Sequence, residues 1–230
     1  MWKQKTIAVS LMLALSACAS ADPRFTAGLK SFQKADYESA LAKWHPAADA
    51  GVRNAQHGIG WLYEKGLGVE QSYKTSANWY LKAAAQGHGG AQLNLGNYFD
   101  SGKGFTKDYK IAAGFFAQAA KNNIAEAQNN LGQMYKMGHG VEQDLEAAAN
   151  LFLAAARQNY APAQNAIGIM YFKGQGIEQD AEKAYFWISL AALNGQEGTE
   201  HNLTFVASFL EKKQIDKIDE EATEWIKART

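Results

Sequence analysis

The sequence predicts an all-α fold, an α/α superhelical solenoid built from repeated helix pairs. The main observation is a fixed step of 36 residues, at which glycines and apolar residues recur along most of the chain. A period of this length is typical of repeat architectures. Only three prolines occur among 230 residues, and 47% of the residues are hydrophobic, so long helices and a sizeable core are both possible.

The 36-residue step appears at several positions of each unit. It links the glycines Gly60, Gly96, Gly132 and Gly168. It also links the Ala-Gln pairs that begin at Ala55, Ala91, Ala127 and Ala163, and the aromatic residues Tyr63, Phe99, Tyr135 and Tyr171. A Gly-x-Gly segment follows each time, beginning at Gly66, Gly102, Gly138 and Gly174. Agreement at so many positions indicates a true structural repeat.

Each unit is expected to contain two helices, as residues 91–102 and 109–121 illustrate. In the first helix Ala91, Leu95 and Phe99 are four residues apart and form one apolar stripe. The Gly-x-Gly segment should end this helix, because glycine accepts the left-handed conformation found just beyond a helix C-terminus. Side-chain oxygens suited to an N-cap stand where the second helix begins, at Ser72, Asp108, Asp144 and Asp180.

The glycine in the middle of every first helix also requires a physical explanation. Each such glycine costs about 1 kcal/mol of helix stability relative to alanine. We therefore predict that Gly60, Gly96, Gly132 and Gly168 lie where neighbouring backbones approach too closely for a Cβ atom.

Residues 1–21 have the features of an export signal. Lys3 and Lys5 precede a short apolar run from Ile7 to Leu15, and small residues follow. The segment 15–18 resembles a bacterial lipobox, in which Cys18 would be lipidated and would anchor the protein to a membrane without crossing it. The alternative is ordinary cleavage before Asp22. We expect an exported, periplasmic protein, with an outer-membrane lipoprotein as the favoured form.

The repeat resembles the Sel1-like repeat, with the pattern Ala-Gln-x-x-Leu-Gly-x-x-Tyr-x-x-Gly-x-Gly-Val. Residues 127–141 carry this pattern in full. The resemblance covers residues 24–228, with repeats at about 55–90, 91–126, 127–162 and 163–198 and capping helices at both ends. It implies an α/α superhelix related to tetratricopeptide repeats and a binding or scaffolding role. The last unit departs from the pattern at Thr204 and Ala207.

Catalytic and metal-binding signatures are absent from the sequence. It contains no Walker A segment, no G-x-S-x-G elbow and no H-E-x-x-H helix. The five histidines fall at five different phases of the repeat, so we do not expect them to converge on a metal. Lysine plus arginine and aspartate plus glutamate are both 23, which argues against a nucleic-acid partner. We expect no enzyme activity, cofactor or metal.

A solenoid usually binds its partner on the concave face, which the first helices line. Positions that vary between units are candidates for this face. The candidate partner-binding residues are Trp61, Asn94, Asn97, Asp100, Asn130, Gln133, Lys136, Ile169 and Phe172. Amides can hydrogen-bond a peptide backbone, and exposed aromatics are common interface anchors. The alternative is that the amides are ordinary solvated surface and that Trp61 packs under the N-terminal helix.

The function predicted from these observations is a non-enzymatic adaptor of the bacterial cell envelope that binds a protein partner. Two alternatives stay open. A glycan- or cell-wall-binding module could stack a sugar on Trp61 beside amide and carboxylate groups, and a cell-wall hydrolase would fit the expected location.

Overall fold

The computed structural model describes residues 22–229, and Cys18 with the rest of the leader lies outside this range. The described residues form twelve helices and no strand, which confirms the predicted all-α class. The helices are α2 (Pro23–Gln33), α3 (Tyr37–Asp49), α4 (Arg53–Lys65), α5 (Tyr73–Ala85), α6 (Gly89–Ser101), α7 (Tyr109–Lys121), α8 (Ala125–Met137), α9 (Leu145–Arg157), α10 (Ala161–Lys173), α11 (Ala181–Leu193), α12 (Thr199–Ala207) and α13 (Lys212–Lys227).

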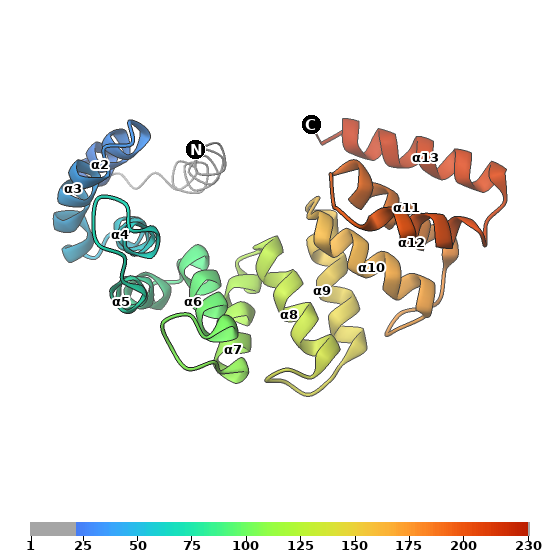
Figure 1. Ribbon diagram of the computed structural model, residues 1–230, viewed down its shortest axis with the longest axis horizontal. Helices are drawn as coiled ribbons and strands as arrows, with labels where there is room; N and C mark the ends of the chain where they lie inside the picture. The colour runs from blue at the N-terminus through green and yellow to red at the C-terminus, as the bar shows by residue number, and fades with distance from the viewer. Residues whose placement is uncertain (1–21, 230) are drawn as a thin grey trace. The chain divides into compact units, whose positions relative to one another are not determined.

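The helices divide into two compact units, the first ending at Lys107 and the second beginning at Asp108. In the first unit the successive helices from α2 to α6 pack against one another. In the second unit α7 to α12 do the same, and α13 packs against α11 (Figure 1). Packing between sequence neighbours is the defining property of a solenoid.

The second helices begin where the sequence predicted. Ser72, Asp108, Asp144 and Asp180 are the N-cap residues of α5, α7, α9 and α11. In each case the side chain accepts a hydrogen bond from the backbone N–H three residues later, for example 2.9 Å from Ala147 N to Asp144 Oδ1. This bond satisfies one of the N–H groups that a helix start leaves without a partner.

The two glycines of each Gly-x-Gly segment have different roles. The first is the left-handed C-cap of α4, α6, α8 or α10, as predicted. The second also has a positive φ, and a Cβ there would overlap the start of the preceding second helix. At Gly140 it would meet the backbone of Tyr109, and at Gly176 that of Leu145. The second glycine therefore lets the loop lie directly on the previous repeat.

The mid-helix glycines accommodate side chains more than backbones, which corrects the prediction. A Cβ at Gly60 would lie 2.6 Å from the ring of Tyr80, and one at Gly132 would lie 3.0 Å from the ring of Phe152. At Gly168 the nearest atom is in the side chain of Ile188, at 2.6 Å. Gly60, Gly132 and Gly168 thus make room for a large side chain of the second helix in the same pair.

In three of the four Ala-Gln pairs the glutamine side chain bonds to a carbonyl of the preceding helix. Gln56 Nε2 donates to the carbonyl of Ala48 at 2.9 Å, and Gln164 Nε2 donates to that of Ala156 at 3.3 Å. Both acceptors lie in the last turn of a helix, where carbonyls lack intrahelical partners. The recurring glutamine is therefore a structural residue and not a ligand-binding one.

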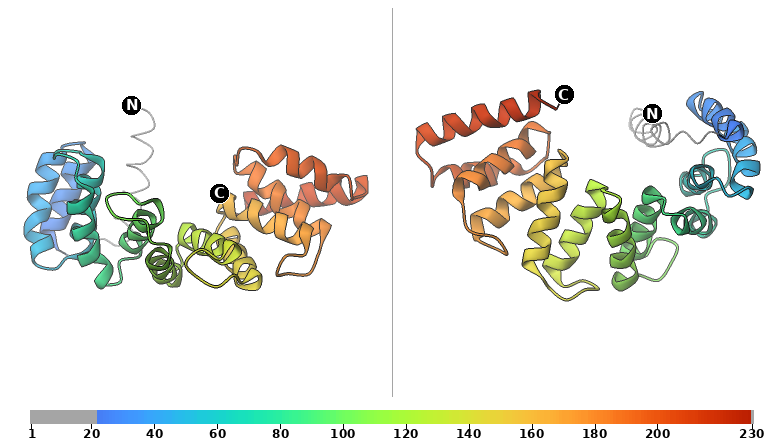
Figure 2. Two further views of the ribbon diagram at one scale, coloured as in Figure 1. Left: turned by 60° about the horizontal axis from the view of Figure 1, so that its bottom comes forward. Right: turned by 180° about the vertical axis from the view of Figure 1, so that it is seen from behind.

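The second unit ends in a cluster formed by α10 to α13, the orange and red helices that remain packed together in both views of Figure 2. Ile218 and Ala222 of α13 are buried, and Ile215 and Trp225 pack against the same core. This is the apolar stripe expected of a capping helix. Within the described part of the chain, no helix has the length and apolar character needed to cross a bilayer.

Candidate functional site

Trp61 is not an exposed anchor, which corrects the groove interpretation at this position. Its side chain is only 7% exposed, and its ring packs edge-on against Phe32 of α2 with the centroids 5.4 Å apart. The alternative, packing under the N-terminal helix, describes the arrangement seen. A buried indole offers no surface on which a sugar could stack, so the feature that favoured a glycan-binding module is missing.

The other candidates of the first unit, Asn94, Asn97 and Asp100, are partly exposed residues of α6. Asn94 Nδ2 lies 3.3 Å from His57 Nε2, which links α6 to α4. The carbonyl of Asn97 accepts a 2.6 Å hydrogen bond from Ser101. The contact of Asn94 with His57 is structural, because it joins two helices of the first unit.

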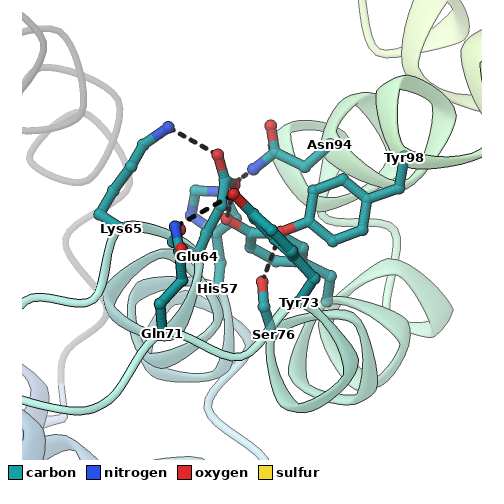
Figure 3. A network of polar contacts seen from close by, with 9 residues as sticks. His57, Glu64, Lys65, Gln71, Tyr73, Ser76, Asn94 and Tyr98 are labelled. Carbon is teal, nitrogen blue, oxygen red and sulfur yellow. Dashed lines mark hydrogen bonds and ion pairs between the residues drawn. The ribbon is translucent and has the colours of Figure 1, made fainter. Parts of the chain in front are cut away.

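A polar network that the sequence did not predict lies beside Asn94 and centres on Glu64 of α4 (Figure 3). The Glu64 carboxylate is only 11% exposed. Lys65 Nζ lies 2.6 Å from its Oε1, and the hydroxyl of Tyr80 donates to its Oε2 at 2.8 Å. The backbone carbonyl of Glu64 accepts a 2.7 Å hydrogen bond from Gln71. Both carboxylate oxygens thus have partners within the unit.

Two tyrosine hydroxyls are buried around this carboxylate. Tyr98 and Ser76 share a hydrogen bond of 2.9 Å between their hydroxyls, and Tyr80 donates to Glu64. Burial raises the pKa of Tyr80 well above its ordinary value, and the Glu64 charge adds to the effect. Burial likewise raises the pKa of Tyr98. A tyrosine that keeps its proton serves here as a hydrogen-bond donor, so the network joins helices of the first unit.

His57 and His88 meet in the first unit, although they occupy different phases of the repeat. Their rings stack with centroids 4.3 Å apart. His88 also caps α6, because its Nδ1 accepts a 3.1 Å hydrogen bond from Ala91 N. Burial lowers the pKa of both rings, to about 4 for His88, so both are neutral at pH 7. This contact joins two different phases of the repeat, and the spacing of the histidines in the sequence does not predict it. No group of three or more metal-ligating side chains occurs among residues 22–229.

The candidates of the second unit lie on α8 and α10 and are more accessible. Gln133 is exposed, whereas Asn130, Lys136, Ile169 and Phe172 are partly exposed. Asn130 Oδ1 accepts a 3.3 Å hydrogen bond from the neighbouring Asn129. The remaining four combine an amide, an ammonium group and two apolar side chains on the first helices of two successive repeats.

The sequence analysis missed two residues of this surface, Phe205 and Phe209. They are 51% and 59% exposed, and their rings are 5.4 Å apart. Phe172 contacts both, with centroid distances of 5.3 Å to Phe205 and 5.1 Å to Phe209. The signal was present, because Phe205 lies 36 residues after Ile169. It was overlooked because Thr204 and Ala207 replace the motif residues of this unit.

Solved structures of bacterial proteins share this fold. The chain is 30% identical to c5321, a protective antigen present in uropathogenic Escherichia coli strains displaying an SLR fold, with a TM-score of 0.79. That match covers 89% of this chain and 45% of the other. A Sel1 repeat protein from Oxalobacter formigenes is 26% identical, with a TM-score of 0.71 and coverage of 97% and 93%.

A curated relative matches a short stretch only. Chitin synthase regulatory factor 3 of Schizosaccharomyces pombe is 41% identical over 49 residues, which is 21% of this chain and 5% of that protein. This chain thus spans a small part of that relative and less than half of c5321.

The repeat itself identifies the family. The Sel1 repeat model matches residues 53–88, 90–124, 125–160 and 161–196, which together make up more than half of the chain. Each match contains all or nearly all of one first helix and the whole of its second helix, with the glycine C-cap and the acidic or serine N-cap described above. This chain belongs to the Sel1 repeat family.

Proposed function

We propose that this chain is a non-enzymatic adaptor that binds a segment of a protein partner through its first helices. Sel1 repeat proteins generally act as scaffolds for protein–protein interactions. One observation supports such a role for this chain. The first helices of the second unit bury their recurring residues, such as Ala127 and Ala163, and leave variable ones accessible, such as Gln133 and Phe172.

The polar groups of the first unit also support a non-enzymatic role. The Glu64 carboxylate and the hydroxyls of Tyr80 and Tyr98 have hydrogen-bond or ion-pair partners inside the unit. Groups that are already satisfied inside the protein stabilise a framework, whereas catalysis needs an acid, base or nucleophile that can reach a substrate.

The location that we propose is the bacterial cell envelope, with a lipid anchor at Cys18. The support is the leader sequence, in which two lysines, a short apolar run and a lipobox-like segment precede the cysteine. An adaptor held at a membrane surface by lipid would present its repeats to partners in the periplasm.

Photo-crosslinking in intact cells tests the binding proposal. A benzophenone amino acid at Gln133, which is exposed on α8, should give discrete adducts of higher mass. The same amino acid at Asn150, which is exposed on α9, is the matched control. If adducts formed equally at both positions, or at neither, the first helices would not be the binding surface.

A further inference from the structure

Phe205 and Phe209 of the second unit are exposed, and they form an aromatic patch with Phe172, which is partly exposed and also packs against the core. Phe172 of α10 and Phe205 of α12 touch each other and Phe209, which directly follows α12. More than half of the Phe205 and Phe209 side-chain surface is accessible. Aromatic side chains bury a large area on contact with a partner, and exposed clusters of this kind mark interaction sites.

Two lysines lie on the same series of helices. Lys136 occupies in α8 the position that Phe172 occupies in α10, and Lys173 directly follows Phe172. Neither lysine has an ion-pair partner among the described residues. Lys136 and Lys173 lie in the last turns of α8 and α10, the first helices of successive repeats. Partial burial lowers the pKa of Lys136, and the positive charge of Lys173 lowers it further. An anion beside them would relieve this repulsion. We call these five residues the Phe–Lys patch: Phe172, Phe205, Phe209, Lys136 and Lys173.

The charge of the patch argues for an acidic protein segment more than for a membrane surface. Binding to an anionic bilayer needs a cluster of several basic residues, each of which contributes about 1 kcal/mol. The patch has two lysines, and the whole chain has a formal net charge of zero. Gln133, exposed on α8, adds an amide that can pair with a peptide backbone.

We propose that the Phe–Lys patch binds a peptide segment in which a large apolar side chain is flanked by carboxylates. The apolar side chain packs among Phe172, Phe205 and Phe209, and a carboxylate of the segment pairs with Lys136 and Lys173. Ammonium–carboxylate pairs beside an apolar anchor give a site both affinity and orientation. This inference rests on the proposed function and specifies the chemistry of the partner.

A phage-displayed library of random 12-residue peptides, selected on the purified protein, provides the test. The selected peptides should be enriched in aspartate and glutamate next to phenylalanine, leucine or tryptophan. A labelled selected peptide is then titrated by fluorescence anisotropy. The double variant Phe205→Ser with Phe209→Ser should weaken binding at least tenfold, and the double variant Lys136→Gln with Lys173→Gln should weaken it about three- to tenfold and reduce its salt dependence.

Two matched variants control for general effects. Ile111→Ser removes another exposed apolar side chain of the second unit, which is 43% exposed, and Lys110→Gln removes an exposed charge. Both lie on α7 and should leave peptide binding unchanged. Circular dichroism of every variant confirms that the helices are retained. Lys173→Glu should weaken the acidic peptide and improve binding of the same peptide with its acids replaced by lysine.

The outcomes separate the inference from the proposed function. If peptides are enriched without acidic residues, or bind equally to the Phe205/Phe209 variant, the Phe–Lys patch is not the site although peptide binding stands. If no peptide is enriched, both proposals are contradicted. If no peptide binds but vesicles containing phosphatidylglycerol do, and the same variants abolish that binding, the patch is a membrane contact instead.

Discussion

The hydroxyl of Tyr80 in α5 donates a 2.8 Å hydrogen bond to Glu64 Oε2 at the end of α4. The bond joins the two helices of one repeat at a carboxylate that is 11% exposed. Hydrogen bonds to charged groups contribute more to stability than neutral ones, and a buried acceptor left unsatisfied is costly.

Tyr80→Phe should therefore destabilise the protein by about 1.5–3 kcal/mol, measured as the free energy of unfolding in urea. Tyr63→Phe is the matched control, because no hydrogen bond of its hydroxyl occurs within the described residues. Equal losses in the two variants would show that the Tyr80–Glu64 bond contributes nothing specific.

Replacing Gly60 or Gly114 with alanine should change the stability of the protein in opposite directions. A Cβ at Gly60 would lie 2.6 Å from the Tyr80 ring and 3.2 Å from the carbonyl of Ser76, so Gly60→Ala should cost about 1–3 kcal/mol through overpacking. A Cβ at Gly114 in α7 would meet nothing within 4 Å, so Gly114→Ala should stabilise by up to about 1 kcal/mol. Thermal unfolding measures both, and stabilisation by Gly60→Ala would contradict the packing argument.

The period of the sequence was enough to predict the helix pairs and their ends. Asp144 and Gly138 show why: an N-cap oxygen and a left-handed C-cap are local requirements, so the residue type alone reveals them. Contacts between different phases of the repeat could not be read from the period. His57 lies within α4 and His88 caps α6, and their rings stack. The two residues occupy different positions of the repeat, so a comparison of equivalent positions does not reveal their contact.

The candidate site was harder to predict, because the ends of the array depart from the repeat. Trp61 shares its phase with the accessible Gln133 but is covered by Phe32, which belongs to a helix before the first matched repeat. Phe205 and Phe209 lie after the last matched repeat, in a segment that was assigned only a capping role. Positions that vary between repeats indicated the candidate binding surface. Which of these positions are exposed depends on the side chains that pack over them in the folded protein.

The proposed lipid anchor makes a prediction about mass. If the lipobox interpretation holds, the mature protein begins at Cys18 and has the mass of that chain plus a thioether-linked diacylglycerol and an amide-linked acyl chain. Intact mass spectrometry of the protein extracted from the membrane fraction measures this. Cys18→Ser should abolish the adduct and release the protein from the membrane. A wild-type chain that begins at Asp22 without lipid would show ordinary cleavage instead.

The stacked histidines predict that stability falls in mild acid. Burial lowers the pKa of His57 and of His88. The neighbouring His88 further opposes protonation of His57, and the charge of Arg53 opposes protonation of His88. A histidine with a depressed folded-state pKa binds fewer protons in the folded chain than in the unfolded chain. Between the unfolded value of about 6.5 and the folded value of about 4 for His88, stability therefore decreases as pH falls.

Urea unfolding between pH 7 and pH 4 measures this loss, and His88→Asn isolates the contribution of one ring. Asparagine retains an N-cap oxygen for Ala91 N but cannot take up a proton in this range, so the variant should keep most of its stability at pH 7. Its stability should then fall less steeply than that of the wild type, by about 3 kcal/mol less over the window. His45→Asn is the control, because His45 lies outside the stacked pair and packs against Trp79. Parallel stability curves for wild type and His88→Asn would mean that the neutral, buried state of His88 does not govern the acid response.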